Sequence, residues 1–168
     1  MVQRVYRQIR EVDRTATVTI ATSKSQVSAI RNQLGDDVSI CVEPCRRDTF
    51  PAIALASAYL HDVKNVGLDE AVVVGPVDPF VENGYFETIK TMQKLAQGSD
   101  HGLVLMGIEP SYPSEKYGYI IPQTADQVSL VDCFQEKPDS KTAEAYISQG
   151  ALWNGGVFAF RLGHVYDD

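Results

Sequence analysis

Hydrophobic positions recur with helical spacing at the start of the chain and then gather in short unbroken runs. Residues 2–12 place four apolar side chains on one face of a helical wheel and arginines elsewhere, which predicts an amphipathic helix. Those four are Val2, Val5, Ile9 and Val12. The β-branched run at 17–21 (TVTIA) is too short for a helix of this kind and predicts a buried strand.

Strands and helices are predicted in alternation as far as residue 108. Ser23 with Gln26 three residues later has the pattern of a capping box, and Gly35 supplies the end of that helix. The run 71–74 (AVVV) shows no polar alternation, which predicts a strand covered on both faces and therefore a parallel sheet. The predicted strands are 17–21, 38–42, 71–74 and 103–108, and the predicted helices are 23–34, 49–60 and 82–97.

After Pro110 the pattern changes to short segments rich in tyrosine and proline. Residues 117–121 (YGYII) and 128–134 (VSLVDCF) are spaced like the strands of a hairpin. Ser140 is the predicted cap of a short helix that Gly150 ends, and a strand at 157–160 (VFAF) follows. The whole pattern predicts an α/β fold.

Composition narrows the class of protein. With 168 residues, of which 44% are hydrophobic and 22% charged, the chain is in the range of one globular domain. Fifteen basic and 22 acidic side chains give a net charge of -7, which argues against nucleic acid as a partner. The apolar runs are too short for a membrane span or a secretory signal, so we expect no membrane partner.

Cysteine and histidine offer little chemistry. Three cysteines fit no disulfide framework, and Cys41 and Cys45 have neither zinc spacing nor a redox motif, so we expect reduced, packed thiols and a cytoplasmic protein. For the scattered His61, His101 and His164 we expect no catalytic role. The sequence also contains no P-loop, GxGxxG motif or supported Ser-His-Asp arrangement.

The residues that follow predicted strands are the candidates for chemistry, because ligands of parallel sheets bind beyond the carboxyl ends of the strands. Asp78 lies between two prolines after the run 71–74, where a carboxylate can be presented to a divalent cation. A turn-forming or helix-capping aspartate is the alternative. Glu43 and Asp48 follow the second predicted strand, and Glu109 follows the fourth.

Three further motifs each allow a functional and a structural interpretation. Glu136 and Lys137 could hold a hydroxylated ligand that bears a phosphate, or form solvated surface. The segment 153–156 (WNGG) could stack and hydrogen-bond a sugar ring, or form a glycine turn beside a core tryptophan. The segment 46–48 (RRD) before a helix could bind an anion or a base, or be solvated.

Taken in order, five motifs resemble those of mannose-1-phosphate guanylyltransferases. The resemblance covers nearly the whole chain and implies a nucleotide-diphospho-sugar transferase fold, a mostly parallel sheet between helices. Its motifs are 43–56 (EPCRRDTFPAIALA), 75–79 (GPVDP), 107–110 (GIEP) with 117–120 (YGYI), 134–138 (FQEKP) and 153–158 (WNGGVF).

The resemblance implies a division of roles. On the nucleotide side, Glu43, Asp48 and Thr49 are similar to the residues that receive guanine and ribose, and Asp78 is similar to one of two aspartates that hold Mg²⁺. The implied reaction is in-line attack by a phosphate oxygen of mannose 1-phosphate on the α-phosphorus of GTP, with release of pyrophosphate and without a covalent enzyme intermediate. Lys137 and Asp78 are the implied catalytic residues.

On the sugar side, Gly118, Glu136 and Asn154 are similar to residues that contact sugar hydroxyls, and Lys137 is similar to the lysine that pairs with the sugar phosphate. The chain departs from the family pattern at Asp48, where asparagine is common, and at Pro79, where histidine often follows the metal aspartate.

The family's Gly-Gly-X-Gly-X-Arg loop and second metal aspartate are absent from this sequence. We therefore expect residues 1–168 to be an internal fragment of the catalytic domain, inactive alone. Uncovered sheet edges would favour self-association, so a homo-oligomer is one expectation. Two alternatives stay open: a glucose-1-phosphate transferase that uses another nucleotide, and a catalytically dead module that acts in assembly or regulation.

Overall fold

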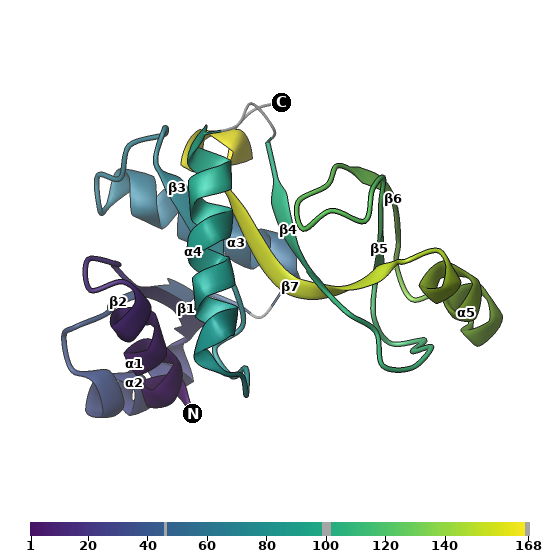
Figure 1. Cartoon of the computed structure of the whole chain (residues 1–168). Helices are drawn as coiled ribbons and strands as arrows, with labels where there is room; N and C mark the ends of the chain where they lie inside the picture. Colours follow the sequence, from purple (N-terminus) through teal and green to yellow (C-terminus); the bar gives the residue numbers. More distant parts are fainter. Residues whose placement is uncertain (46, 99–101, 167–168) are drawn as a thin grey trace. The chain divides into compact units, whose positions relative to one another are not determined.

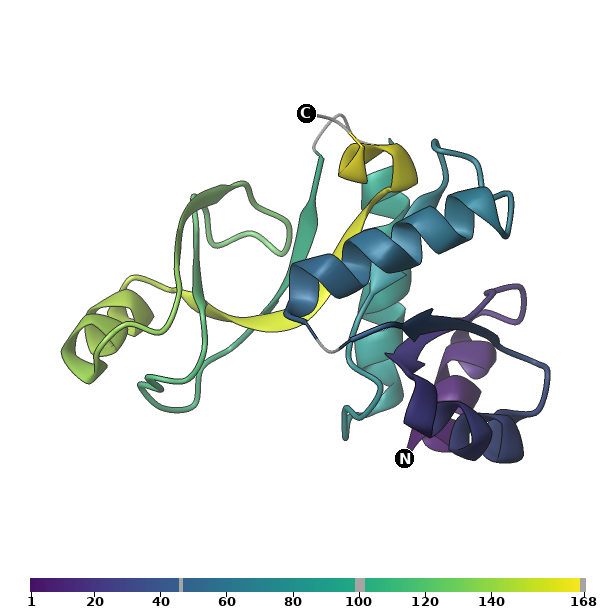
Figure 2. The same ribbon diagram turned by 180° about the vertical axis from the view of Figure 1, so that it is seen from behind.

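A computed structural model describes residues 1–45, 47–98 and 102–166. The chain forms two compact units. The first unit consists of Met1–Val104 and Phe158–Asp168, and the second unit consists of Leu105–Val157. The chain thus leaves the first unit once and returns to it through the strand that contains Phe158. Figures 1 and 2 show the ribbon from opposite sides.

The first unit begins as the hydrophobic pattern predicts. Helix α1 (Val2–Val12) precedes strand β1 (Thr19–Ser23), and β2 (Ser39–Glu43) pairs with β1 in parallel. A 3-10 turn, η1 (Lys24–Gln26), leads into helix α2 (Val27–Leu34). These elements enclose a small core of apolar side chains. Its buried members are Ile20, Ile30, Leu34 and Val38, with Val2, Tyr6, Val18 and Ile40 packed against them.

The predicted capping box at the start of α2 is wrong. The Ser23 side chain makes no capping hydrogen bond and lies 3.0 Å from the Ser25 hydroxyl, while Gln26 accepts a hydrogen bond from Thr22. Gly35, with φ of 61°, ends α2 as predicted, because glycine enters the left-handed region without a steric penalty.

Two longer helices complete the first unit. Helix α3 (Thr49–Asp62), visible along its whole length in Figure 2, contacts β1 and β2. Helix α4 (Asn83–Gly98) follows strand β3 (Ala71–Val74) and lies beside α1, as Figure 1 shows. The prediction of a parallel sheet fails at β3, which is only half-buried and pairs antiparallel with the end of β7, Val74 opposite Phe158. In this chain the unbroken apolar run AVVV therefore indicated neither the direction of the strand nor its degree of burial.

The second unit contains the predicted hairpin. Strands β5 (Tyr119–Pro122) and β6 (Val131–Gln135) pair antiparallel, with Ile120 opposite Phe134. Strand β7 (Leu152–Arg161) pairs through Trp153 with Tyr119 of β5. Strand β4 (Val104–Ile108), whose first residue belongs to the first unit, also pairs with β7, and the 3-10 turn η2 (Leu162–Val165) follows β7.

Helix α5 (Ser140–Ser148) covers the hairpin and shares its core. That core contains Tyr119, Ile121, Ala143 and Ala151, with Tyr146, Ile147 and Trp153 packed against it. The cap of α5 is Asp139, whose carboxylate accepts the Thr142 N–H at 2.7 Å, so the prediction of Ser140 as the cap is wrong by one residue. Gly150 follows the helix with φ of 83°, as expected for its stop.

Two properties of the chain bear on the sequence predictions. None of the helices in the described ranges is long and apolar enough to cross a membrane. All three cysteines are described and free, which agrees with the expected thiols, but only Cys41 is packed inside, because Cys45 and Cys133 are exposed.

Candidate active site

The four predicted sugar-side residues come together in the second unit. Gly118 precedes β5, Glu136 and Lys137 follow β6, and Asn154 lies in β7, so hairpin and strand pairing bring the three segments side by side. The backbone holds them there: Asn154 N–H donates to the Gly118 carbonyl at 2.8 Å, and Lys137 N–H donates to the Tyr117 carbonyl at 3.2 Å.

Gly118 is the close-packed centre of this sugar-side cluster. It is buried, and a Cβ added to it would lie 2.6 Å from Glu136 Oε2 and 2.7 Å from Phe134 Cζ. These distances are shorter than real Cβ contacts, so any side chain at 118 would displace the Glu136 carboxylate or the Phe134 ring. The backbone at this position needs no left-handed conformation, and the requirement for glycine is one of space.

Glu136 and Lys137 present opposite charges to solvent. Lys137 Nζ lies 3.2 Å from Glu136 Oε1, and both side chains are more than half exposed. An exposed pair of this kind contributes little to stability, which leaves both groups available to a ligand. Lys137 has φ of 45°, an uncommon conformation for a residue with a side chain, and the buried Pro138 follows it.

Asn154 and Trp153 occupy strand β7, so the glycine-turn interpretation of 153–156 is wrong. Asn154 Oδ1 accepts the Gly156 N–H at 3.1 Å, where Gly156 has φ of 68°. The Trp153 ring packs against Tyr117 and Tyr112, with centroids 4.9 and 5.1 Å away. Its Nε1 is buried without a hydrogen-bond partner in the part of the chain that the structure describes.

Sequence reasoning missed the residue that anchors the loop before Gly118. The Tyr119 side chain is fully buried, and its hydroxyl donates to the Ser114 carbonyl at 3.0 Å and accepts the Ser114 N–H at 2.9 Å. The signal in the sequence was a tyrosine within the predicted hairpin strand 117–121, because a phenol that is buried there needs hydrogen-bond partners.

The predicted nucleotide-side residues lie in the first unit. Glu43 ends β2 and is half-buried. Asp48 is exposed and caps α3, since its carboxylate accepts the Thr49 N–H at 2.9 Å. The prediction for Arg46 lies outside the described residues. Arg47, its neighbour, is exposed.

The Cys41 thiol beside this segment is a core group. It lies 3.9 Å from the Leu55 carbonyl, and burial, followed by the charge of Glu43, raises its pKa. A thiol whose pKa is raised is a poor nucleophile. Cys41 is therefore no candidate for catalysis.

Asp78 follows β3 in the segment between that strand and α4. It is exposed and has no hydrogen-bond or ion-pair partner among the residues described. The described residues contain no group of three potential metal ligands. Mg²⁺ is usually bound through one or two carboxylates together with substrate phosphates, and a single unpaired carboxylate fits that mode.

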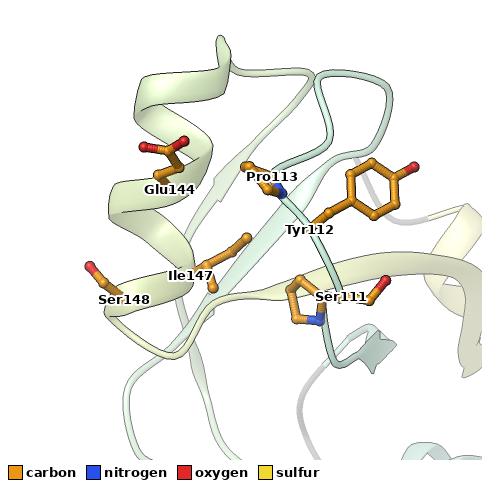
Figure 3. A pocket seen from close by; sticks show the side chains of 7 residues that line it. Ser111, Tyr112, Pro113, Glu144, Ile147 and Ser148 are labelled. Carbon is orange, nitrogen blue, oxygen red and sulfur yellow. The ribbon is translucent and has the colours of Figure 1, made fainter.

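A pocket in the second unit lies apart from the predicted site residues. This pocket, of about 310 Å³, separates α5 from the segment after β4. Figure 3 shows Ile147 of α5 on the side of the helix that faces the segment with Pro113, while the Tyr112 ring points away from the helix. No predicted site residue lines the pocket. The His61 ring hydrogen-bonds to the backbone, with Nδ1 3.1 Å from the Val66 carbonyl. His101 lies outside the described residues.

Comparison with known proteins assigns the family. The model of the nucleotidyl transferase family matches residues 1–168. The chain belongs to the nucleotidyl transferase family. This nucleotidyl transferase is 33% identical, over all of its length, to the xanthan biosynthesis protein XanB of Xanthomonas campestris pv. campestris, of which it covers 36%. It is 35% identical, over 75% of its length, to a mannose-1-phosphate guanylyltransferase of Escherichia coli, of which it covers 28%.

A solved structure agrees with these relatives. The crystal structure described as mannose-1-phosphate geranyltransferase from Thermus thermophilus superposes with a TM-score of 0.82 and 28% identity, covering 97% of this nucleotidyl transferase and 48% of that chain. The mixed α/β nucleotide-sugar transferase fold and the resemblance to mannose-1-phosphate guanylyltransferases are both confirmed. The chain spans about a third of the length of the curated relatives it matches.

Proposed function

We propose that the complete protein carrying this chain transfers a guanylyl group from GTP to mannose 1-phosphate, giving GDP-mannose and pyrophosphate. The observation that carries the proposal is the sugar-side cluster. A carboxylate, an ammonium group and a carboxamide project from Glu136, Lys137 and Asn154, and backbone hydrogen bonds join their segments around Gly118. Family membership supplies the reaction class.

The groups in the cluster suit a sugar phosphate. The Glu136 carboxylate can accept hydrogen bonds from sugar hydroxyls, and the Asn154 amide can both donate and accept. The Lys137 ammonium is a point charge that can pair with the phosphate of the sugar. The phosphate would then replace the Glu136 carboxylate as the anionic partner of Lys137. Together these groups would fix the orientation of the attacking phosphate oxygen.

The transfer itself needs no covalent intermediate. The phosphate oxygen of mannose 1-phosphate forms a bond to the α-phosphorus of GTP as the bond to the bridging oxygen of pyrophosphate breaks, and pyrophosphate leaves with that electron pair. Asp78 would hold Mg²⁺, which when bound offsets the charge of the phosphates. Glu43, Asp48 and Thr49 would receive the guanine and ribose.

A matrix of substrates tests the proposal. The complete protein is incubated with Mg²⁺ and each pairing of GTP, UTP, dTTP or ATP with mannose 1-phosphate or glucose 1-phosphate, and pyrophosphate release is measured. We expect GTP with mannose 1-phosphate to exceed every other pair at least about tenfold in kcat/KM, equivalent to about 1.4 kcal/mol. A preference for glucose 1-phosphate with another nucleotide would contradict it, and a folded protein without turnover on any pair would indicate a non-catalytic module.

A further inference from the structure

Side chains of helix α1 hydrogen-bond to the segment that carries Asp78. The carbonyl of Val81 accepts two hydrogen bonds from this helix, one from Arg4 Nη2 at 2.9 Å and one from Gln8 Nε2 at 3.1 Å. Arg4 and Gln8 are four residues apart and therefore neighbours on one face of α1. A carbonyl oxygen has two lone pairs, so these two donors satisfy its full capacity.

Gln8 and Arg4 also contact residues on either side of Val81, namely Asn83 and Phe80. Gln8 Nε2 also donates to Asn83 Oδ1 at 3.0 Å, and Asn83 Nδ2 donates to Glu11 Oε2 at 3.3 Å. The Arg4 guanidinium stacks over the Phe80 ring, 4.3 Å from its centroid, although that ring is 83% exposed. We call Arg4, Gln8 and their contacts to residues 80–83 the α1 clamp.

Helix α1, which carries the clamp residues, is itself attached to α4. Lys90 of α4 donates to the Val12 carbonyl at the end of α1 at 3.2 Å and lies 3.7 Å from the Asp13 carboxylate. Gln8 is buried, with 7% of its surface exposed, on the same side of α1 as the buried Val5. A polar side chain in that position needs partners. Its Nε2 finds them at Val81 and at Asn83, the first residue of α4, whereas its Oε1 is buried without a hydrogen-bond partner among the described residues.

Asp78 itself is held by backbone alone. Its carboxylate has no partner within the described ranges, so its position is set by the anchors on each side of it in the chain. One anchor is β3, where Val74 pairs with Phe158. The next is the clamp at Val81, and Pro79 restricts the backbone between them.

We propose that Arg4 and Gln8 are positioning residues for Asp78: they fix the segment 75–83 so that its carboxylate meets the metal that accompanies the nucleotide. The inference rests on the proposed function, in which Asp78 holds Mg²⁺. In this role Arg4 and Gln8 act on the backbone of the segment and need no contact with substrate. Each acts through the Val81 carbonyl, and Gln8 acts through Asn83 as well.

The test compares Arg4→Ala, Gln8→Leu and Asp78→Asn in the complete protein. Mn²⁺ serves as the probe, since carboxylates that bind Mg²⁺ also bind Mn²⁺, and its binding is titrated by electron paramagnetic resonance in the presence of GTP. We expect each variant to weaken Mn²⁺ binding about tenfold, as removal of residues that orient metal ligands does elsewhere. KM for mannose 1-phosphate should change less than twofold. Arg4→Lys, which keeps a donor and a cation near Phe80, should recover part of the loss.

Hydrogen–deuterium exchange supplies a readout that does not depend on activity. Amides in 75–83 should exchange faster in Arg4→Ala and Gln8→Leu. The matched control is Gln3→Ala, on the same helix, which loses a glutamine hydrogen bond to the Gln33 carbonyl at 3.0 Å and should change neither measurement. Unchanged Mn²⁺ binding in both clamp variants would overturn the inference, as would an equal effect of Gln3→Ala. If Asp78→Asn alone weakens binding, only the clamp fails. If Asp78→Asn has no effect, the metal role of Asp78 fails and the clamp with it.

Discussion

At the scale of single residues, the sugar-side cluster depends on the absence of one side chain. Gly118 admits the Glu136 carboxylate and the Phe134 ring into the space where a Cβ would stand. The sequence motif YGYI pointed to Gly118 only through resemblance, because nothing in the spacing of residues reveals that a carboxylate 18 positions later approaches it. That approach is a product of the β5–β6 hairpin.

Replacement of Gly118 by alanine should therefore damage the sugar-side cluster more than the fold. The added methyl group would push Glu136 Oε2 and the Phe134 ring outward, both of which lie at the exposed surface and can move. We expect KM for mannose 1-phosphate to rise about tenfold or more, from the loss of a charged hydrogen-bond acceptor. The KM for GTP should change less than twofold.

Gly67→Ala is the control for the Gly118 measurement. A Cβ at Gly67 would make only an ordinary contact, 3.8 Å from Glu70 Cγ, and its backbone is outside the left-handed region. The Gly67→Ala substitution should leave KM for mannose 1-phosphate and KM for GTP unchanged. A Gly118→Ala enzyme with an unaltered KM for mannose 1-phosphate would mean that Glu136 does not contact the sugar.

Two polar residues could have been found from the sequence and were not. Gln8 interrupts the apolar face of the predicted helix 2–12, and Tyr119 carries a hydroxyl in the predicted hairpin strand 117–121, where the structure buries it. In each case the sequence shows that a buried polar group needs a partner. It does not show which one, because Val81 and Ser114 are brought to them by the fold.

At the scale of elements, local signals located helices well and their caps less well. Asp139 and Ser140 are both good capping residues, and the sequence does not show which of them is the last residue before the helical backbone begins. The Thr142 backbone N–H, followed by the Thr142 hydroxyl, lowers the pKa of Asp139 from its ordinary 3.8.

This cap predicts a pH dependence of stability. Because the folded-state pKa of Asp139 is lowered, its stabilisation is present above pH 3.8 and is lost as the pH falls through the lowered folded-state pKa. Asp139→Ala should reduce the thermal midpoint at neutral pH, and the difference from the parent protein should shrink in acid. Thermal melts of both proteins, followed by circular dichroism from neutral pH to below pH 3.8, measure this difference in midpoint.

Ser140→Ala provides the comparison, since the Ser140 side chain does not cap the helix. It should change the midpoint little at any pH. An equal loss in Ser140→Ala, or a difference for Asp139→Ala that persists at pH values far below the lowered pKa, would contradict the capping assignment.

Strand direction and strand length were the element-level properties that the sequence could not supply. The run AVVV predicts a buried parallel strand, yet β3 is half-buried and its partner β7 runs antiparallel to it after the chain has passed through the second unit. Likewise WNGG contains two glycines, which are typical of turns, but pairing with β5 extends β7 through Trp153. Hydrogen bonds to neighbours outweigh local turn preference here.

At the scale of the whole molecule, the two compact units divide the predicted site residues between them. Glu43, Asp48, Thr49 and Asp78 belong to the first unit, and Gly118, Glu136, Lys137 and Asn154 belong to the second. The resemblance of the sequence motifs implies two sets of roles, nucleotide side and sugar side, and the residues of each set fall within one unit. The structure adds that each group is carried by its own set of packed elements.

This division predicts that the two substrates respond to different substitutions. Thr49→Val removes a hydroxyl at the start of α3 and should raise KM for GTP about fivefold, the effect of one neutral hydrogen bond, without changing KM for mannose 1-phosphate. Lys137→Ala removes a charge-assisted contact and should raise KM for mannose 1-phosphate about tenfold or more, with little change for GTP.

The double variant Thr49→Val with Lys137→Ala completes the measurement. Substitutions without shared partners act independently, so its loss in kcat/KM should be the product of the two single losses. Steady-state kinetics of the complete protein, with each substrate varied in turn, give all four values. An equal rise of both KM values in Lys137→Ala would identify a structural lysine, in keeping with its left-handed backbone and the buried Pro138 beside it. A loss in kcat/KM for the double variant that is much smaller than the product of the two single losses would mean that the two groups of residues act on one shared step.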